Sequence, residues 1–207
     1  MDRVHRLRRG GAGACAVKEE LAASKRMTPP TSSIDTPRLR LVAGTALLHA
    51  AELDDATALG PLLGVEVPAD WPPADGEYDR DAIGFFLRQL TEAPDVIGWH
   101  SFYVVTRAEP GSRARLVANA GYFGPPDERG SVEIGYTVVA DRRGRGYATE
   151  AVRALVARAF ERGATRVLAH TRPDNLPSIA VLTKCRFRPS AVTERPETLG
   201  FERLREA

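Results

Sequence analysis

The chain has 207 residues, of which 43% are hydrophobic and 27% charged, ordinary values for one globular domain with its own core. No run of about 18 apolar residues occurs, so we expect no membrane-spanning helix. The net charge of +2 originates in residues 1–27, which hold seven Lys/Arg and three Asp/Glu, while the rest of the chain is slightly acidic. Charge therefore gives no support to nucleic-acid binding by the folded part.

Two cysteines and four histidines are present, without the spacing of a metal site. Cys15 and Cys185 lie far apart, and Cys15 is in a predicted tail segment, which excludes a disulfide framework. We therefore expect a reducing, cytoplasmic compartment and no bound metal.

Residues 1–34 are predicted to be a disordered leader that precedes a domain at residues 35–207. The leader combines arginines, a short Gly/Ala run and a Thr-Pro-Pro-Thr-Ser-Ser segment, a composition that does not build a core. Its Gly/Ala run is too short and too weakly apolar for a secretory signal. Met27 is an alternative start of the protein, and RNA binding by the basic leader is a separate hypothesis.

The first half of the domain is predicted to alternate strands and helices. Leu39 and Leu41 alternate with arginines, which is typical of a half-buried strand at residues 36–42. We expect a helix at 45–58 with Thr45 as its N-cap, a loop at 59–80, and a second helix at 81–91. Strands at 98–106, 115–123 and 131–139 have hairpin-like spacings that predict an antiparallel meander.

After residue 147 the apolar residues change to a helical period. Positions 148–160 carry the i, i+3, i+4, i+7 pattern of one helix face, and Gly163 is expected to end this helix. A strand at 165–171 completes a parallel strand–helix–strand unit, and Asn175 caps a further helix that precedes two short strands. The predicted fold class is mixed α/β: a mostly antiparallel sheet with one parallel strand pair and helices on both faces.

Residues 133–151 carry the pattern richest in chemistry, a strand that runs into a glycine-rich turn and then into an amphipathic helix. Gly144 and Gly146 let the backbone curl closely around a ligand, and amides at a helix N-terminus attract anions. Three arginines add positive charge to this turn: Arg142, Arg143 and Arg145. The pattern predicts a cradle for a diphosphate.

Three kinds of phosphate ligand use a cradle of this design. A P-loop needs a Gly-Lys-Ser/Thr triplet, which the chain lacks. A dinucleotide fingerprint needs a third glycine where Thr149 stands and an acid at the end of the next strand, which instead ends in His170 and Thr171. The pyrophosphate arm of coenzyme A is the third.

The sequence resembles the GNAT superfamily of acetyltransferases over residues 36–204. Residues 143–148 match the signature R/Q-x-x-G-x-G/A, and residues 175–187 resemble the family's N-x-x-S…K-x-G-F helix. Residues 36–41 resemble the opening strand of the branch that acetylates ribosomal-protein N-termini. Arg186 stands where the family has glycine, which predicts a helix end other than the left-handed C-cap.

The resemblance implies a GNAT-like fold in which acetyl-CoA, as co-substrate, lies in a wedge between two splayed parallel strands. Its pantetheine would bond to strand backbone and its diphosphate to amides of the turn. The residues that the resemblance assigns to acetyl-CoA are Thr137, Val138, Val139, Arg143, Gly144, Arg145, Gly146, Tyr147, Ala148, Asn175 and Lys184.

Two residues are the candidate catalytic groups. Glu133 occupies the strand position of the general base in the histone-acetylating branch, and it would deprotonate the amine, directly or through a water. Ser178 is the candidate donor to the departing CoA thiolate, because the tyrosine that many members use would fall at Leu182. The alternatives are an ion-pair partner of an arginine for Glu133 and a helix-start serine for Ser178.

The acceptor is expected to be a primary amine, either a protein N-terminus or a small molecule. The acidic 59–80 loop is a candidate lid, with Trp71 and Glu77 as substrate contacts; its alternative is a solvated loop. Trp99 and His100 are interpreted as strand packing, and Cys185 as a small core residue. A module that binds acyl-CoA without catalysis is the alternative function, and the protein is expected to be a monomer or homodimer.

Overall fold

The computed structural model of the chain describes residues 33–73, 78–108, 111–190, 195 and 197–206. Residues 1–32 of the predicted leader, with the alternative start at Met27, lie outside these ranges. Ser33 and Ile34, which the leader was predicted to include, belong instead to the first strand. Ile34 pairs with Leu41 and packs against the core, a contact that local composition does not reveal.

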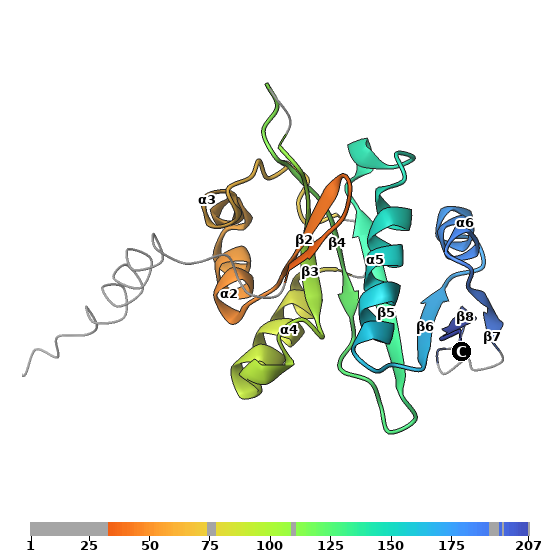
Figure 1. The fold of residues 1–207 in the computed structure, drawn as a ribbon. Coiled ribbons are helices and arrows are strands. Elements are labelled where there is room, and N and C mark those ends of the chain that lie inside the picture. The colour runs from red at the N-terminus through yellow and green to blue at the C-terminus, as the bar shows by residue number, and fades with distance from the viewer. Residues whose placement is uncertain (1–32, 74–77, 109–110, 191–194, 196, 207) are drawn as a thin grey trace, which may run out of the picture. The chain divides into compact units, whose positions relative to one another are not determined.

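One mixed sheet of eight strands forms the centre of the described chain, in the order β1-β2-β3-β4-β5-β6-β8-β7 (Figure 1). Every neighbouring pair is antiparallel except β5 and β6, which run parallel. The predicted meander and parallel pair are thus confirmed. The strands are β1 (Ser33–Asp35), β2 (Leu39–Ala43), β3 (Ser101–Thr106), β4 (Leu116–Tyr122), β5 (Ser131–Val138), β6 (Arg166–Thr171), β7 (Arg188–Ser190) and β8 (Leu199–Leu204).

Helices cover both faces of the sheet, as predicted. They are α2 (Ala46–Asp54), α3 (Leu59–Leu63), α4 (Arg80–Glu92), α5 (Tyr147–Glu161) and α6 (Leu176–Lys184). α5 and α6 pack on one face, and α2, α3 and α4 on the other (Figure 1). Within the described ranges, no helix is long and apolar enough to cross a membrane.

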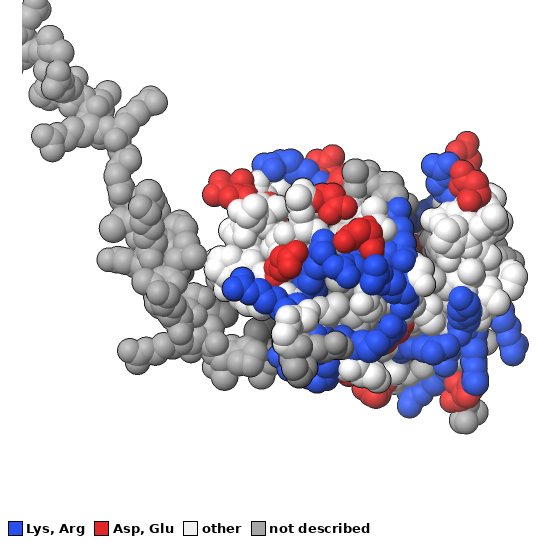
Figure 2. Space-filling view, turned by 90° about the horizontal axis from the view of Figure 1, so that it is seen from above, with Lys and Arg blue, Asp and Glu red and all other residues white. Residues whose placement is uncertain are grey.

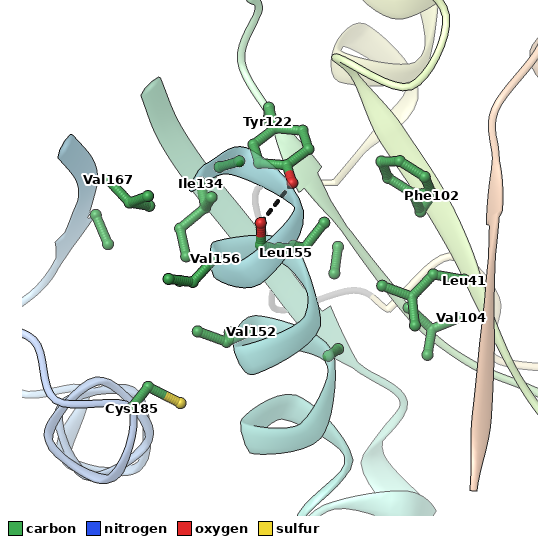
Figure 3. Packing of buried hydrophobic residues seen from close by; sticks show 14 of the residues in the cluster. Leu41, Phe102, Val104, Tyr122, Ile134, Val152, Leu155, Val156, Val167 and Cys185 are labelled. Carbon is green, nitrogen blue, oxygen red and sulfur yellow. Dashed lines mark hydrogen bonds between the residues drawn. The ribbon is translucent and has the colours of Figure 1, made fainter. Parts of the chain in front are cut away.

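The larger core lies between the sheet and α5. Alternate strand residues point to opposite faces, so Leu41 and Phe102 meet Val152 and Leu155 of the helix (Figure 3). The Tyr122 hydroxyl donates a 2.6 Å hydrogen bond to the Leu155 carbonyl. Leu155 is fully buried, which contributes about 1.5–3 kcal/mol relative to an exposed side chain. The 3.6-residue period of α5 thus fixes it against the sheet.

The second core, on the α2 and α4 face, contains a buried carboxylate. Glu52 of α2 accepts hydrogen bonds from Trp71 Nε1 at 2.6 Å, from the Tyr78 hydroxyl at 2.7 Å and from the Tyr103 hydroxyl at 2.6 Å. A buried carboxylate is costly unless donors surround it, and here three satisfy it. Trp71 and Tyr78, near the end of the 59–80 segment, are therefore tied to α2.

Helix starts follow the predicted capping residues. The Thr45 hydroxyl accepts from the Leu48 amide, and the Asn175 side chain accepts from the Ser178 amide. Each side chain satisfies an amide that the first helical turn leaves without a partner. Both predicted N-caps are confirmed.

Helix ends confirm one prediction and overturn another. Gly163, at φ +97°, ends α5 in the left-handed conformation, as predicted. The prediction for Arg186 is wrong, because this arginine takes the same conformation, at φ +62°. The amides of Arg186 and Phe187 bond to the carbonyls of Thr183 and Leu182, and these two bonds compensate for the strain of a side chain there.

Several boundaries differ from prediction, and the helix expected at 45–58 ends at Asp54. The expected loop at 59–80 contains the short helix α3, which packs Leu59 into the second core. The strand expected from residue 98 begins at Ser101, since residues 97–100 form a turn before it. Trp99 packs on Tyr122 and lies outside the strand.

Candidate active site

The parallel strands β5 and β6 separate after three paired residues. Their pairing runs from Ser131 opposite Arg166 to Glu133 opposite Leu168 and then stops, although β6 continues to Thr171. β5 stays paired with β4 from residue 134 to residue 138. A wedge therefore opens between β5 and β6 beyond Glu133, as the resemblance implied.

A cavity of about 650 Å³ occupies this wedge, a volume typical of cofactor and ligand sites. It is lined by β4, β5, the turn before α5, the end of β6 and the first turns of α6. Most of the predicted acetyl-CoA and catalytic residues line it: Glu133, Thr137, Val138, Arg143, Gly144, Gly146, Tyr147, Ala148, Asn175, Ser178 and Lys184. Val139, Arg145 and Trp71 are not among its lining residues.

The strand register decides which β5 backbone groups face the wedge. The Val139 amide donates to the Val117 carbonyl, so it belongs to the sheet and is not available to a ligand. In an antiparallel pair this orientation alternates, so Thr137 also turns its backbone towards β4. Tyr136 and Val138 are the residues whose backbone faces the wedge. The assignment of the Thr137 and Val139 backbone to the cofactor is therefore corrected, although Thr137 still lines the cavity.

The turn before α5 has the backbone that a diphosphate cradle requires. Gly144 and Gly146 take φ +72° and +81°, a region that residues with a side chain enter only with strain. The 15-residue helix α5 starts directly after Gly146, so its first amides face the cavity end of the turn. Figure 2 looks onto this end of the molecule, where Lys and Arg side chains gather over the middle of the face.

A clasp formed by Thr36, Arg38 and Glu150 holds this turn to the first strands. Glu150 of α5 accepts from the Thr36 hydroxyl at 2.6 Å, the Arg38 amide at 2.9 Å and Arg38 Nε at 2.7 Å. The Arg38 guanidinium also donates to the Arg145 carbonyl at 3.0 Å. Burial raises the pKa of Glu150, but these hydrogen bonds and the Arg38 charge together lower it more, so the net shift is downward.

This clasp gives the opening segment 36–41 a role beyond strand formation, and sequence reasoning did not find it. The partners are 112 to 114 residues apart, so no local pattern links them. Arg145, predicted to contact the cofactor, contributes through its carbonyl to the clasp instead of lining the cavity.

Glu133 projects from the sheet face opposite α5. Its neighbours Val132 and Ile134 pack against α5, so alternation turns Glu133 towards the α4 side of the cavity. His170 Nδ1 lies 3.0 Å from Glu133 Oε1, and an Arg195 guanidinium nitrogen lies 3.1 Å from the same oxygen. Among the described residues, Glu133 is the one carboxylate that lines the cavity. Its place in the cavity lining is compatible with a base, and its contact with Arg195 is the ion pair of the alternative hypothesis, so the structure leaves both open.

Ser178 meets a tyrosine that sequence reasoning missed. The Tyr136 hydroxyl lies 2.9 Å from Ser178 Oγ, and both side chains line the cavity. Burial raises the pKa of Tyr136 to about 12. The alternation of β5 could have suggested this, since Tyr136 shares a face with Ile134, but only the fold brings α6 to it. Leu182, at the position where many members have tyrosine, is fully buried in the core.

The residues of the α6 helix divide between the cavity and the core. Asn175 and Lys184 line the cavity, and Asn175 also caps the helix. Cys185 is 1% exposed, burial raises the pKa of its thiol, and its Sγ donates to the Thr149 carbonyl at 3.5 Å. This fits the interpretation of Cys185 as a small core residue. In the described part of the chain, no group of three or more His, Cys, Asp and Glu is arranged to hold a metal ion.

The α4 end of the cavity is lined by aromatic and small polar residues, and Tyr78, Phe86, Ser101 and Asn119 contribute to it. Asn119 Nδ2 is buried without a hydrogen-bond partner among the described residues. Trp71, predicted to contact the substrate, is 7% exposed and donates to Glu52 beneath this surface. The structure thus gives Trp71 a packing position, because its indole nitrogen satisfies the buried carboxylate. Glu77 lies outside the described residues.

Comparison with known proteins gives two sequence matches. A family model described as "Acetyltransferase (GNAT) domain" matches residues 46–188. The Bacillus subtilis (strain 168) protein named "Uncharacterized N-acetyltransferase YjdG" is 33% identical over 156 residues, which cover 74% of this chain and 88% of that protein.

Solved structures share the fold at low sequence identity. The ribosomal-protein-S5-alanine acetyltransferase of Vibrio fischeri has a TM-score of 0.55 at 15% identity, covering 83% of this chain and 96% of its own. The microcin C7 self-immunity acetyltransferase MccE, solved in complex with acetyl-CoA and AMP, has a TM-score of 0.55 at 13% identity, covering 85% and 98%. These likenesses support the same fold over more than four fifths of the chain.

Proposed function

Because the chain belongs to the GNAT family of N-acetyltransferases, we propose that it transfers the acetyl group of acetyl-CoA directly to a primary amine. One observation carries the proposal. A single cavity joins the glycine turn that suits a diphosphate to Glu133, its one described carboxylate. A cofactor cradle and a base that share one cavity are what acyl transfer to an amine requires.

The residues present fit acetyl-CoA. The amides that follow Gly144 and Gly146, the α5 N-terminus and the side chains of Arg142 and Arg143 provide donors and positive charge for a diphosphate. The backbone of Tyr136 and Val138 faces the wedge, where the pantetheine arm of the co-substrate would lie. Asn175 and Lys184 complete the lining on the α6 side.

The proposed reaction needs one base and one hydrogen-bond donor. Glu133 takes a proton from the substrate ammonium, directly or through a water, and frees the nitrogen lone pair. The nitrogen attacks the thioester carbonyl carbon, whose oxygen is stabilised by a wedge-facing amide of β5. The carbon–sulfur bond then breaks, and the thiolate receives hydrogen bonds from Ser178 and Tyr136, whose hydroxyls lie 2.9 Å apart. The surplus proton of the attacking nitrogen passes to the thiolate, so the products are a neutral amide and the CoA thiol. No covalent enzyme intermediate forms.

The acceptor class is proposed at the level of a primary amine. The aromatic and small polar lining at the α4 end suits an amine that carries an apolar group. Solved neighbours named as ribosomal-protein acetyltransferases support a protein N-terminus as one candidate. A small-molecule amine is the other candidate.

The test is acetyl transfer from labelled acetyl-CoA to a panel of amines. The panel holds peptides that begin with Ala, Ser or Met, an aminoglycoside, and free lysine. Transfer to at least one of them, reduced about 100-fold or more in Glu133→Gln with unchanged acetyl-CoA affinity, is the expected result. Selective acetyl-CoA binding with no transfer to any amine would instead favour a module that binds acyl-CoA without catalysis.

We also propose that residues 1–26 are not needed for this activity. Every residue named in the site lies at or after Thr36, so a chain that begins at Met27 should keep its affinity for acetyl-CoA, measured by calorimetry. If only the longer chain bound RNA, the leader would have a function of its own.

A further inference from the structure

One histidine nitrogen and one arginine nitrogen converge on the same oxygen of Glu133. They are His170 Nδ1, at 3.0 Å, and an Arg195 guanidinium nitrogen, at 3.1 Å, and both contact Oε1. The Glu133 side chain is 23% exposed and lines the cavity, so it has room to turn unless it is held. The convergence on Oε1 is therefore a restraint on the orientation of the carboxylate.

The contact with Glu133 places a requirement on the His170 ring. An ionised carboxylate can only accept a hydrogen bond, so the ring must carry a proton on Nδ1 when it bonds to Glu133. The His170 side chain is 5% exposed, and its Nε2 has no hydrogen-bond partner among the described residues. Burying the unpaired Nε2 is costly, so hydrogen bonding by the ring as a whole does not explain its buried position. The contact that its nitrogens do make among the described residues is the one from Nδ1 to Glu133.

The charged and titratable groups around this pair come from every side of the cavity. Arg195 contacts Glu133 and also lies over the Phe123 ring, 4.9 Å from its centre. The other such groups that line the cavity are Tyr78, Tyr122, Tyr136, Tyr147, Arg142, Arg143, Arg172 and Lys184. Glu133 is the only carboxylate among the described residues of this lining. No other acidic side chain of the lining can therefore accept the His170 hydrogen bond in its place.

We propose that His170, assisted by Arg195, is a positioning residue for Glu133. By holding Oε1, it directs Oε2 towards the amine that enters from the α4 side. This inference rests on the proposed role of Glu133 as the base. Misplacement of a reacting group by about 1 Å can cost about 100-fold in rate, so the loss of this contact should lower kcat far more than it changes KM.

The test uses substitutions that keep an N–H group at the position of one ring nitrogen, of the other, or of neither. His170→Asn keeps an N–H at the Nδ1 position, whereas His170→Gln places its amide at the Nε2 position and His170→Leu keeps neither. Each substitution is made in the wild-type chain and in Glu133→Gln. The substrate is the amine of the panel above that is acetylated fastest, and acetyl-CoA affinity and urea midpoints report on folding.

We expect kcat to fall about 10- to 100-fold in His170→Leu and His170→Gln, and less than about threefold in His170→Asn. In the Glu133→Gln background, all three should have no further effect, because the residue they act through is gone. Equal losses in all three variants, or the same losses in both backgrounds, would overturn the proposal.

Two further measurements keep the inference testable if the His170 variants fold poorly. Arg195 is 38% exposed at its side chain, so Arg195→Ala spares the core and should lower kcat only where Glu133 is present. Nitrogen NMR of the wild-type histidines at about pH 9 should show His170 protonated on Nδ1; protonation on Nε2 would contradict the contact.

The outcomes distinguish this inference from the proposed function. If Glu133→Gln keeps full activity, the role of Glu133 fails, and the positioning role fails with it. If Glu133→Gln is inactive but His170→Leu is not impaired, only the positioning role fails.

Discussion

Gly144 offers a matched test of the diphosphate cradle. It lies in the turn before α5 at φ +72°, and a methyl group added there would meet no heavy atom within 4 Å. Gly64, at the end of α3, has φ +69° and equally open surroundings, but it does not line the cavity. The two glycines therefore share their backbone strain and differ in their position relative to the site.

The expected effects follow from this match. Replacing either glycine with alanine places a side chain in the left-handed region, at a cost of about 1–2 kcal/mol in the free energy of unfolding. At Gly144 the methyl group also enters the space where the diphosphate would lie. Losing one charge-assisted hydrogen bond costs about 1.5–3 kcal/mol, or roughly 10- to 150-fold in Kd for acetyl-CoA.

The assay pairs urea unfolding with calorimetric titration of acetyl-CoA for both variants. We expect similar losses of stability, a weakened Kd in Gly144→Ala, and a change below about twofold in Gly64→Ala. Equal affinities in the two variants would refute the assignment of the turn to the diphosphate, and a loss of affinity in both would indicate a general effect of destabilisation.

Three other predictions concern residues around the site. Arg38→Ala removes the two side-chain hydrogen bonds of the clasp, to Glu150 and to the Arg145 carbonyl. It should weaken acetyl-CoA binding about fivefold by calorimetry, a modest effect because Arg38 is 51% exposed; unchanged affinity would contradict this expectation. Arg186→Gly relieves the left-handed φ of +62°, and the extra freedom of glycine in the unfolded chain offsets part of this gain. The unfolding free energy in urea should rise by about 0.5–1 kcal/mol, and a decrease would count against the strain. Burial raises the pKa of Tyr136 to about 12 from 10.0, so its contribution is present below pH 10 and is lost as pH rises towards 12. Urea melts between about pH 9 and 11 should show a shallower loss of stability in Tyr136→Phe, by up to about 1.4 kcal/mol per pH unit; an identical slope would contradict the shift.

The sequence was sufficient for features that depend on local patterns. Apolar periodicity located α5, the caps at Thr45 and Asn175 were visible as residue types, and Gly163 marked a helix end. The glycine turn could be identified because the glycines and arginines that would bind a diphosphate are adjacent in the sequence. These features need only a few consecutive positions, which is why they could be predicted.

Features that depend on long-range contacts could not be predicted in this way. The Glu150 clasp joins residues 112 to 114 positions apart, and the His170 contact joins residues 37 positions apart. The backbone orientation of Val139 depends on its register with β4, which the sequence does not state. Trp71 was expected at the substrate because it lies in an acidic, loop-like segment, but the buried Glu52 draws its indole into the core.

Calorimetric titration of the full chain with acetyl-CoA, with NAD and ATP as controls, tests the central claim most directly. The account predicts one acetyl-CoA bound per chain and no binding of the two controls. A folded protein that does not bind acetyl-CoA would contradict it, because the turn at Arg143–Ala148 would then be only structural.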